Sequence, residues 1–403
     1  MARGNYARIP GYYGGRVLHP LVARLLARIA GVPVDARVFL WLSVASLLAF
    51  FVFIGLYYRL EYSSGGRIWL FLLVTATVVD QYRNYYWHDL FYAALCALFF
   101  LVLRANVWIS LPFALLLYIT RESTIVLVVA LVAVAAVRRR WKLCSAAAFV
   151  GLVGMKLDSA LLAHALPNTQ GMPVFVLDLL KIPYNFAYNI CGLEIWTNTN
   201  ASTLLPPVWT APVPVWLHLG HIREIGYCGF FWQNPASTFL ALAAAFGVLP
   251  LALVRVAKAR DWQVPWPERI DLATALLFGG LMFLLAPLTG TIPARYVLYG
   301  WPLFWLFGVA VLHRAYPASR KRAYIILFSL CISWTPAAVR LVLGPSIGGA
   351  QSISTLTTPG LILSIVVIVV LNAISWRFLA VDSPQASLVP GFSEPMSLSH
   401  KPD

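Results

Sequence analysis

Long apolar runs recur along the chain from Val38 to Ser375, and they constrain its fold more than any other feature. Runs of about 20 apolar residues match a hydrocarbon core about 30 Å thick when they form α-helices. Only 11% of the 403 residues are charged, too few to cover a soluble globule of this size. The sequence therefore predicts an all-α polytopic membrane protein, with about 11 transmembrane helices in a range of about 10 to 12.

The basic residues lie mainly in short loops between the apolar runs. A formal net charge of +15 would suggest a nucleic-acid partner for a soluble protein. Lysine and arginine in short loops beside apolar runs instead indicate membrane orientation, and the strongest cytoplasmic marker is the stretch from Arg138 to Lys142. We expect membrane lipid around the helices and no nucleic acid.

The alternation of apolar and polar stretches divides the chain into five parts. They are an N-terminal interfacial segment (1–36), N-terminal transmembrane helices (37–163), a long folded external loop (164–235), C-terminal transmembrane helices (236–377) and a disordered cytoplasmic tail (378–403). No cleavable signal peptide is visible, so we expect the transmembrane runs to direct insertion.

An amphipathic helix is predicted before the first transmembrane run. One helical face carries Leu18, Val22, Leu25 and Ile29, whereas Arg16, Arg24 and Arg28 lie toward the other. This pattern is typical of a helix lying in the plane of the membrane interface.

The stretch from Asp80 to Asp89 places two acids, an arginine and a histidine between two apolar runs. A charge at the bilayer centre costs roughly 2.5 to 3.5 kcal/mol on insertion scales, so this stretch indicates a water-filled site or a membrane edge. The flanking runs are short, which is tolerated where the backbone lines a cavity. Asp89 could instead cap the following helix, and the aromatic residues could form an interfacial belt.

Arg121 and Glu122 interrupt the apolar run from Val107 to Val137. As one helix this run would be about 46 Å long and would hold an ion pair in mid-membrane. We therefore predict two short helices that meet at Arg121 and Glu122. This topology leaves the arginine-rich N-terminus outside, against the positive-inside rule. A single span would avoid that conflict but would move Asp80 to Asp89 to the cytoplasmic side.

Charged residues from separate parts of the chain are expected on the external side. Carboxylates there could act as a general base or hold a divalent metal ion, and basic side chains could bind a phosphate group. These residues are Asp80, Arg83, His88, Asp89, Arg121, Glu122, Lys156, Asp158, Arg223, Glu224, Arg295 and Arg340. A polar pocket open to lipid suits an amphiphilic substrate with a charged head.

The long loop contains two further candidate sites. Cys191 and Cys228 could form a disulfide in an oxidising compartment, worth about 4 kcal/mol by the chain-entropy model. His218, His221 and Glu224 are spaced at three residues but lack the H-E-x-x-H order, so a metal site has weak support.

The sequence contains no phosphate-binding loop, nucleophile elbow or dinucleotide fingerprint. Nucleotide hydrolysis, serine hydrolysis and dinucleotide chemistry therefore lack support. A chain without a cytosolic domain would use a lipid-linked donor more plausibly than a sugar nucleotide.

Four stretches resemble parts of the polytopic membrane glycosyltransferases with the GT-C fold, which use polyprenyl-phosphate sugars. They are YYGGRVLHPL (Tyr12 to Leu21), the stretch from Asp80 to Asp89, LYITRE (Leu117 to Glu122), and PARY (Pro293 to Tyr296) followed by Trp301 and Pro302. The long loop after Ala163 also lies where such enzymes carry one.

The resemblance implies transfer of a sugar from a polyprenyl-phosphate-linked donor to an acceptor on the external face of a bacterial cytoplasmic membrane. It implies catalytic roles for the acids Asp80, Asp89 and Glu122. The phosphate of the donor would be held by Arg83, His88, Arg121 and Arg295. The only cofactor that it suggests is a divalent metal ion.

One feature departs from the resemblance, because such enzymes carry a catalytic acid in a loop directly after a first span. Here the first 34 residues contain no Asp or Glu. Either another acid serves as the base, the chain begins downstream of the usual start, or the protein lacks transferase activity. Two other functions therefore stay open: a transporter or lipid flippase, since intramembrane charges also mark transport paths, and a non-catalytic membrane assembly subunit.

Overall fold

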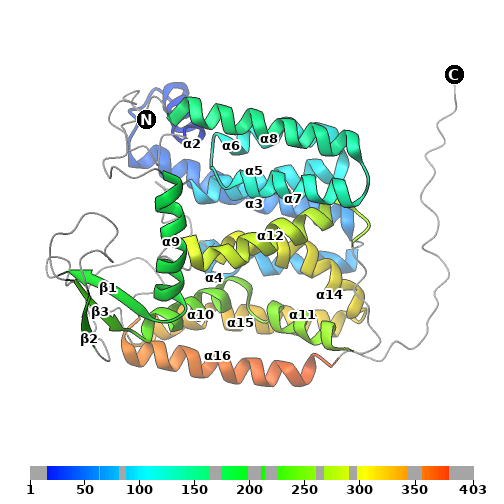
Figure 1. Ribbon diagram of the computed structural model, residues 1–403. Coiled ribbons are helices and arrows are strands. Elements are labelled where there is room, and N and C mark those ends of the chain that lie inside the picture. The colour runs from blue at the N-terminus through cyan, green and yellow to red at the C-terminus, as the bar shows by residue number, and fades with distance from the viewer. Residues whose placement is uncertain are drawn as a thin grey trace.

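The protein is a bundle of helices with a small sheet beside one end (Figure 1). The structure, a computed structural model, describes residues 16–62, 64–80, 88–162, 174–197, 210–213, 226–259, 267–289, 297–343 and 356–380. Of the predicted tail, 378–403, residues 381–403 lie outside these ranges, as do the first 15 residues. Helix α16 includes Phe378.

Helices make up most of the described chain. In order they are α2 (Leu18–Ile29), α3 (Ala36–Glu61), the 3-10 helix η2 (Ser64–Leu73), α4 (Ala76–Asp80), α5 (Asp89–Ala105), α6 (Val107–Tyr118), α7 (Thr124–Val137), α8 (Trp141–Leu162), α9 (Val174–Asn189), α10 (Gln233–Phe246), α11 (Leu249–Lys258), α12 (Ile270–Thr289), η6 (Leu298–Gly300), the π-helix η7 (Pro302–Gly308), α14 (Val309–Ala315), α15 (Ser319–Leu343) and α16 (Thr358–Phe378).

Within the described ranges four helices are long and apolar enough to span a membrane, namely α3, α8, α15 and α16, and the bent pair α10 and α11 would make a fifth. This is fewer than the about 11 transmembrane helices that the apolar runs predict. The reason is that several runs form short or broken elements. Helices α6 and α7 have 12 and 14 residues, and the run Ile68 to Val79 is divided between η2 and α4.

One end of the bundle, which we name the basic end, joins three helices through a cluster of charges. Glu61 at the end of α3 lies 3.3 Å from Arg104 of α5 and also pairs with Arg269, just before α12. Arg269 pairs in turn with Asp271, which accepts a 2.7 Å hydrogen bond from Tyr57. The positive-inside rule predicts that this end faces the cytoplasm, because Arg138 to Lys142 also lie there.

The opposite end, which we name the α2 end, carries α2, the turn between α6 and α7, and the sheet (Figure 1). Figure 1 shows α3 and α8 running between the two ends. Sequence reasoning placed Arg121 and Glu122 between two short helices, and the structure does so as well, with α6 ending at Tyr118 and α7 beginning at Thr124.

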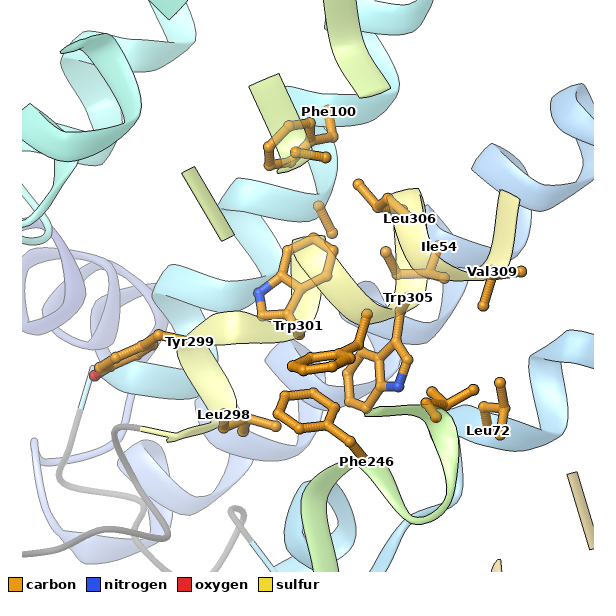
Figure 2. Packing of buried hydrophobic residues seen from close by; sticks show 14 of the residues in the cluster. Ile54, Leu72, Phe100, Phe246, Leu298, Tyr299, Trp301, Trp305, Leu306 and Val309 are labelled. Carbon is orange, nitrogen blue, oxygen red and sulfur yellow. The ribbon is translucent and has the colours of Figure 1, made fainter. Parts of the chain in front are cut away.

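Aromatic side chains fill the bundle between its ends (Figure 2). The ring of Phe50 meets Trp301 edge-on at 5.3 Å, and Phe246 packs on Phe304 at 4.1 Å. Trp305 is fully buried. It lies in the π-helix η7, and Tyr58 donates a 2.5 Å hydrogen bond to its carbonyl. A π-turn disturbs the regular ladder, and Tyr58 gives this carbonyl a partner.

Serines of α15 satisfy backbone groups where other helices break. Ser333 accepts a 2.8 Å hydrogen bond from the Ala76 N–H and donates to the Ala244 carbonyl. Ser329 accepts from the Val248 N–H at 3.3 Å. Helices α10 and α11 bend by 83° around Gly247, whose φ is +55° and which touches the Ser329 backbone so closely that no Cβ fits.

The predicted long loop, 164–235, contains helix α9 and an antiparallel sheet in its described parts. The strands β1 (Leu193–Thr197), β2 (Thr210–Val213) and β3 (Gly226–Phe230) pair in the order β1-β3-β2. Helix α9 packs on α12, where Asn185 donates a 3.0 Å hydrogen bond to the Leu288 carbonyl.

The disulfide between Cys191 and Cys228 is not formed. Cys191 is exposed and has a free thiol, and the sheet register pairs Cys228 with Ile195 instead. Cys191 lies in the turn before β1, where the Gly192 carbonyl accepts a 2.7 Å hydrogen bond from the Phe231 N–H, so the backbone opposite this turn is that of Phe231 and not that of Cys228.

We predict opposite effects for two neighbouring glycines of α12. A Cβ on Gly279 would lie 2.2 Å from the backbone nitrogen of Leu303, whereas a Cβ on Gly280 meets nothing within 4 Å. Because backbone cannot move aside, Gly279→Ala should lower the free energy of unfolding by about 1 to 3 kcal/mol. Thermal unfolding in detergent, followed by tryptophan fluorescence, measures the difference.

The variant Gly280→Ala is the matched control, because it adds the same methyl group one residue along. It should be neutral or slightly stabilising, since alanine favours the helix over glycine. Equal stability of the two variants would contradict the close packing of α12 on η7.

Candidate functional site

A buried ion pair lies at the α2 end. Arg121 donates a hydrogen bond to Oδ1 of Asp89, and each residue is only 5% exposed. Removing two charges from water is costly, and breaking such a pair from one side typically costs about 3 to 5 kcal/mol. The pair therefore joins the start of α5 firmly to the turn between α6 and α7.

Two further side chains complete this cluster. Tyr299 of η6 donates a hydrogen bond to the same Asp89 oxygen, and the Arg121 guanidinium lies over the Tyr299 ring at 4.4 Å. Arg121 Nη1 also lies 3.2 Å from His88 Nε2. The four residues Asp89, Arg121, His88 and Tyr299 are hereafter called the site cluster.

Each member of the site cluster lies where a helix starts or breaks. Asp89 is in the first turn of α5, but His88 is the N-cap residue and makes no side-chain cap hydrogen bond. Capping, the alternative role for Asp89, is thus secondary to its contacts with Arg121 and Tyr299. The Arg121 carbonyl accepts a 2.7 Å hydrogen bond from Thr124, which begins α7. Breaks in helices therefore supply the polar groups of the cluster.

A second ion pair attaches α2 to the same turn. Arg16, just before α2, pairs with Glu122 through two hydrogen bonds. The Glu122 side chain is 50% exposed, so this pair contributes about 0 to 1 kcal/mol. The Leu18 N–H also donates a 3.0 Å hydrogen bond to the Ile119 carbonyl. Two contacts thus fix the start of α2 against the turn that carries Arg121.

His19 connects α2 to the start of α5. It is 3% exposed and its ring lies 5.4 Å from Phe39 and 5.6 Å from Phe91. Burial lowers the pKa of His19 to about 4, although the negative charge of Asp89 acts in the opposite direction. His19 is therefore neutral at pH 7.

The structure brings together only some of the residues that the sequence singles out. His88, Asp89 and Arg121 meet in the site cluster, and Glu122 lies beside it. Asp158 of α8 interacts electrostatically with Glu122 and Arg16. Lys156 lies exposed on α8, and Arg340 lies in the last turn of α15. The other candidates lie outside the described residues or side chains: Asp80, whose backbone ends α4, with Arg83, His218, His221, Arg223, Glu224 and Arg295.

Sequence reasoning missed Tyr299 as a member of the site. Its position was discoverable, because it follows the PARY motif closely and Arg295 was already a candidate. The clustering of Glu61, Arg104, Arg269 and Asp271 at the basic end was also missed. Charges near the ends of apolar runs are common, and no local pattern indicates which of them pair.

The described carboxylates do not fit a divalent metal ion. Asp89 Oδ1 is occupied by Arg121 and Tyr299, and Glu122 faces Arg16. Within the described ranges, no group of three or more histidine, cysteine or acidic side chains could hold a metal ion. The cluster instead offers an acid, an imidazole, a phenol and a guanidinium, which suit proton transfer and anion binding.

Comparison of the chain with protein-family models, curated proteins and solved structures finds no match. The function must therefore be argued from the site cluster and its place in the bundle.

We predict that α2 loosens from the bundle as the pH falls from 6.5 to about 4. His19 has an ordinary pKa of 6.5 and a folded-state pKa of about 4. Between these two values His19 binds a proton when α2 is detached from the bundle but not when α2 is packed on it. The packing of α2 is therefore fully stable above pH 6.5 and weakens as the pH falls below it. A pKa difference of this size corresponds to about 3 kcal/mol. Hydrogen exchange of residues 18–29, corrected for intrinsic rates, measures the loss.

The variant His19→Phe keeps a ring between Phe39 and Phe91 but cannot titrate. Its exchange should be insensitive to pH in this window. An unchanged pH dependence in this variant would refute the role of His19.

Proposed function

We propose that the protein is an integral membrane glycosyltransferase that moves a sugar from a polyprenyl-phosphate-linked donor to an acceptor at the α2 end. The observation that carries the proposal is the site cluster itself. Three separate parts of the chain place Asp89, Arg121 and Tyr299 in contact at the end opposite the basic one. Burying charges is costly, so a structure that retains them there suggests a functional role.

The chemistry requires a base and a cation. In the proposed reaction the acceptor hydroxyl gives its proton to Asp89, its oxygen bonds to the anomeric carbon, and the bond from that carbon to the phosphate oxygen breaks. The leaving group is polyprenyl phosphate, which carries the electron pair of the broken bond. Arg121 stabilises this developing negative charge.

The pairing of Asp89 with Arg121 links these two events. While Asp89 is ionised, the guanidinium of Arg121 is held by that carboxylate. Once Asp89 accepts a proton, its attraction for Arg121 falls and the cation becomes available to the phosphate. Tyr299 holds the carboxylate oriented, and His88, beside Arg121, is placed to pass the proton onward.

We further propose that the shorter elements also pass between the two ends, giving eleven passes in all. Helix α5 leads from Asp89 at the α2 end to Arg104 at the basic end, and α6 returns to Arg121. Helix α7 then leads to Arg138, which bonds to the Pro267 carbonyl near Arg269. The basic stretch from Arg138 to Lys142 favours a cytoplasmic basic end and an outward α2 end, against the arginines of α2 itself. This orientation is in keeping with a cytoplasmic membrane and an acceptor on its external face.

A non-catalytic role as an assembly subunit is the second candidate. It is favoured by the near-complete burial of Asp89 and Arg121, since a buried pair can serve only to fix helices in place. A transporter or flippase has less support. The described core between the two ends is packed with large aromatic side chains (Figure 2), whereas a transport path would need a polar lining.

The deciding experiment separates folding from transfer by removing both charges together. Asp89→Asn or Arg121→Gln alone leaves one buried charge unpaired, so either should unfold or weaken the protein by about 3 to 5 kcal/mol. The double variant Asp89→Asn with Arg121→Gln has no unpaired charge and should fold. We expect it to lose transfer from a radiolabelled polyprenyl-phosphate sugar in reconstituted vesicles by at least about 100-fold.

The cluster at the basic end provides the matched control. The double variant Arg269→Gln with Asp271→Asn also neutralises a charge pair, and Glu61 keeps Arg104 as its partner. It should retain transfer. Full transfer by a folded Asp89→Asn, Arg121→Gln protein would reject the proposed mechanism in favour of a purely structural pair.

A further inference from the structure

Helix α2 presents three distinct faces. With 3.6 residues per turn, residues four apart lie on the same side of a helix. His19, Ala23 and Ala27 form a buried stripe against the bundle. Leu21, Leu25 and Ile29 form a second stripe, which is exposed. Arg24 and Arg28 lie between the two stripes and are exposed as well.

The buried stripe explains how the helix docks on the protein. Ala23 and Ala27 pack with Val38 and Leu42 of α3, where their small side chains allow close approach. The sequence pattern had assigned Leu18, Val22, Leu25 and Ile29 to the apolar face. In the structure Leu25 and Ile29 are exposed, Val22 packs partly against the protein, and the main protein contact uses the alanines.

The exposed stripes match the chemistry of a lipid headgroup layer. Ile29 is 74% and Leu25 55% exposed, which is costly in water but favourable in the outer acyl region. Helix α2 contains no acidic residue, and among the described residues no ion pair involves Arg24 or Arg28. Two exposed guanidiniums beside an exposed apolar stripe are complementary to phosphate groups directly above acyl chains.

We propose that α2 binds the headgroups of anionic phospholipids in the leaflet at the α2 end. The apolar stripe enters the acyl boundary while Arg24 and Arg28 contact the phosphates, and net negative lipid strengthens this contact. The inference is independent of the proposed transferase activity. It identifies the lipid that holds α2, whichever reaction the site cluster performs.

Lipid binding at α2 affects the site cluster, because α2 contacts both the turn that carries Arg121 and the start of α5. The start of α2 is fixed to the turn of Arg121 by the Leu18 N–H and by Arg16. His19 lies against Phe91, in the first turns of α5. A lipid that favours docked α2 therefore also stabilises this turn, because ligand binding shifts the equilibrium toward the bound state.

The test uses the full chain in nanodiscs of phosphatidylcholine, with and without phosphatidylglycerol, and measures hydrogen exchange of residues 18–29 and 119–123. Two arginines near an anionic surface should slow exchange in α2 roughly tenfold when phosphatidylglycerol is present. The turn at 119–123 should become slower as well. In the variant Arg24→Gln with Arg28→Gln, the lipid dependence should disappear while both stripes remain.

The matched control is Lys142→Gln with Lys258→Gln, which removes two exposed charges far from α2. It should keep the lipid dependence, and exchange within α8 confirms that each variant is folded. The proposal fails if exchange in α2 is equal in the two lipids or if the arginine variant keeps the difference. It also fails if inorganic phosphate added to phosphatidylcholine nanodiscs reproduces the effect, since the ligand would then be a free anion.

Discussion

Hydrogen bonding of the backbone at helix breaks is the constraint on which the bundle depends. Lipid offers no partner to an exposed N–H or carbonyl, so each break must be satisfied by the protein. Ser333 meets this need for two elements at once, α4 and α10, and Ser329 does so for the start of α11. Tyr58 gives the Trp305 carbonyl its partner in the π-helix. One helix, α15, thus organises several interrupted ones.

The same breaks create the site cluster. In a regular helix the backbone groups bond to one another within the helix. At the ends of α5, α6 and η6 this regular pattern stops, and Asp89, Arg121 and Tyr299 meet there. The attraction between Asp89 and Arg121 offsets the cost of removing both charges from water. Helix α2 lies beside this pair, through the interaction of His19 with Asp89 and of Arg16 with Glu122. Polar function and interrupted helices therefore have a common structural origin.

Part of this arrangement was predictable from sequence. Asp89 and Arg121 stood out because charges beside apolar runs are costly, and the break at Arg121 followed from the excessive length of one helix. The partners were not predictable. Tyr299 is one aromatic residue among many, and no local pattern pairs Arg16 with Glu122 across the chain. The stripe of Ala23 and Ala27 was missed because hydrophobicity ranks leucine first, whereas close packing favours small residues.

The 3-10 helix η2 lengthens a short segment that runs back along the bundle between α3 and α5. Helices α3 and α5 both run toward the basic end, where Glu61 meets Arg104, so the chain must return between them. The described part of this return is η2 followed by α4, from Ser64 to Asp80. A 3-10 helix rises about 2.0 Å per residue against about 1.5 Å in an α-helix, so the ten residues of η2 gain about 5 Å. Tighter winding therefore lets η2 cover a distance along the bundle that an α-helix with the same number of residues would not reach.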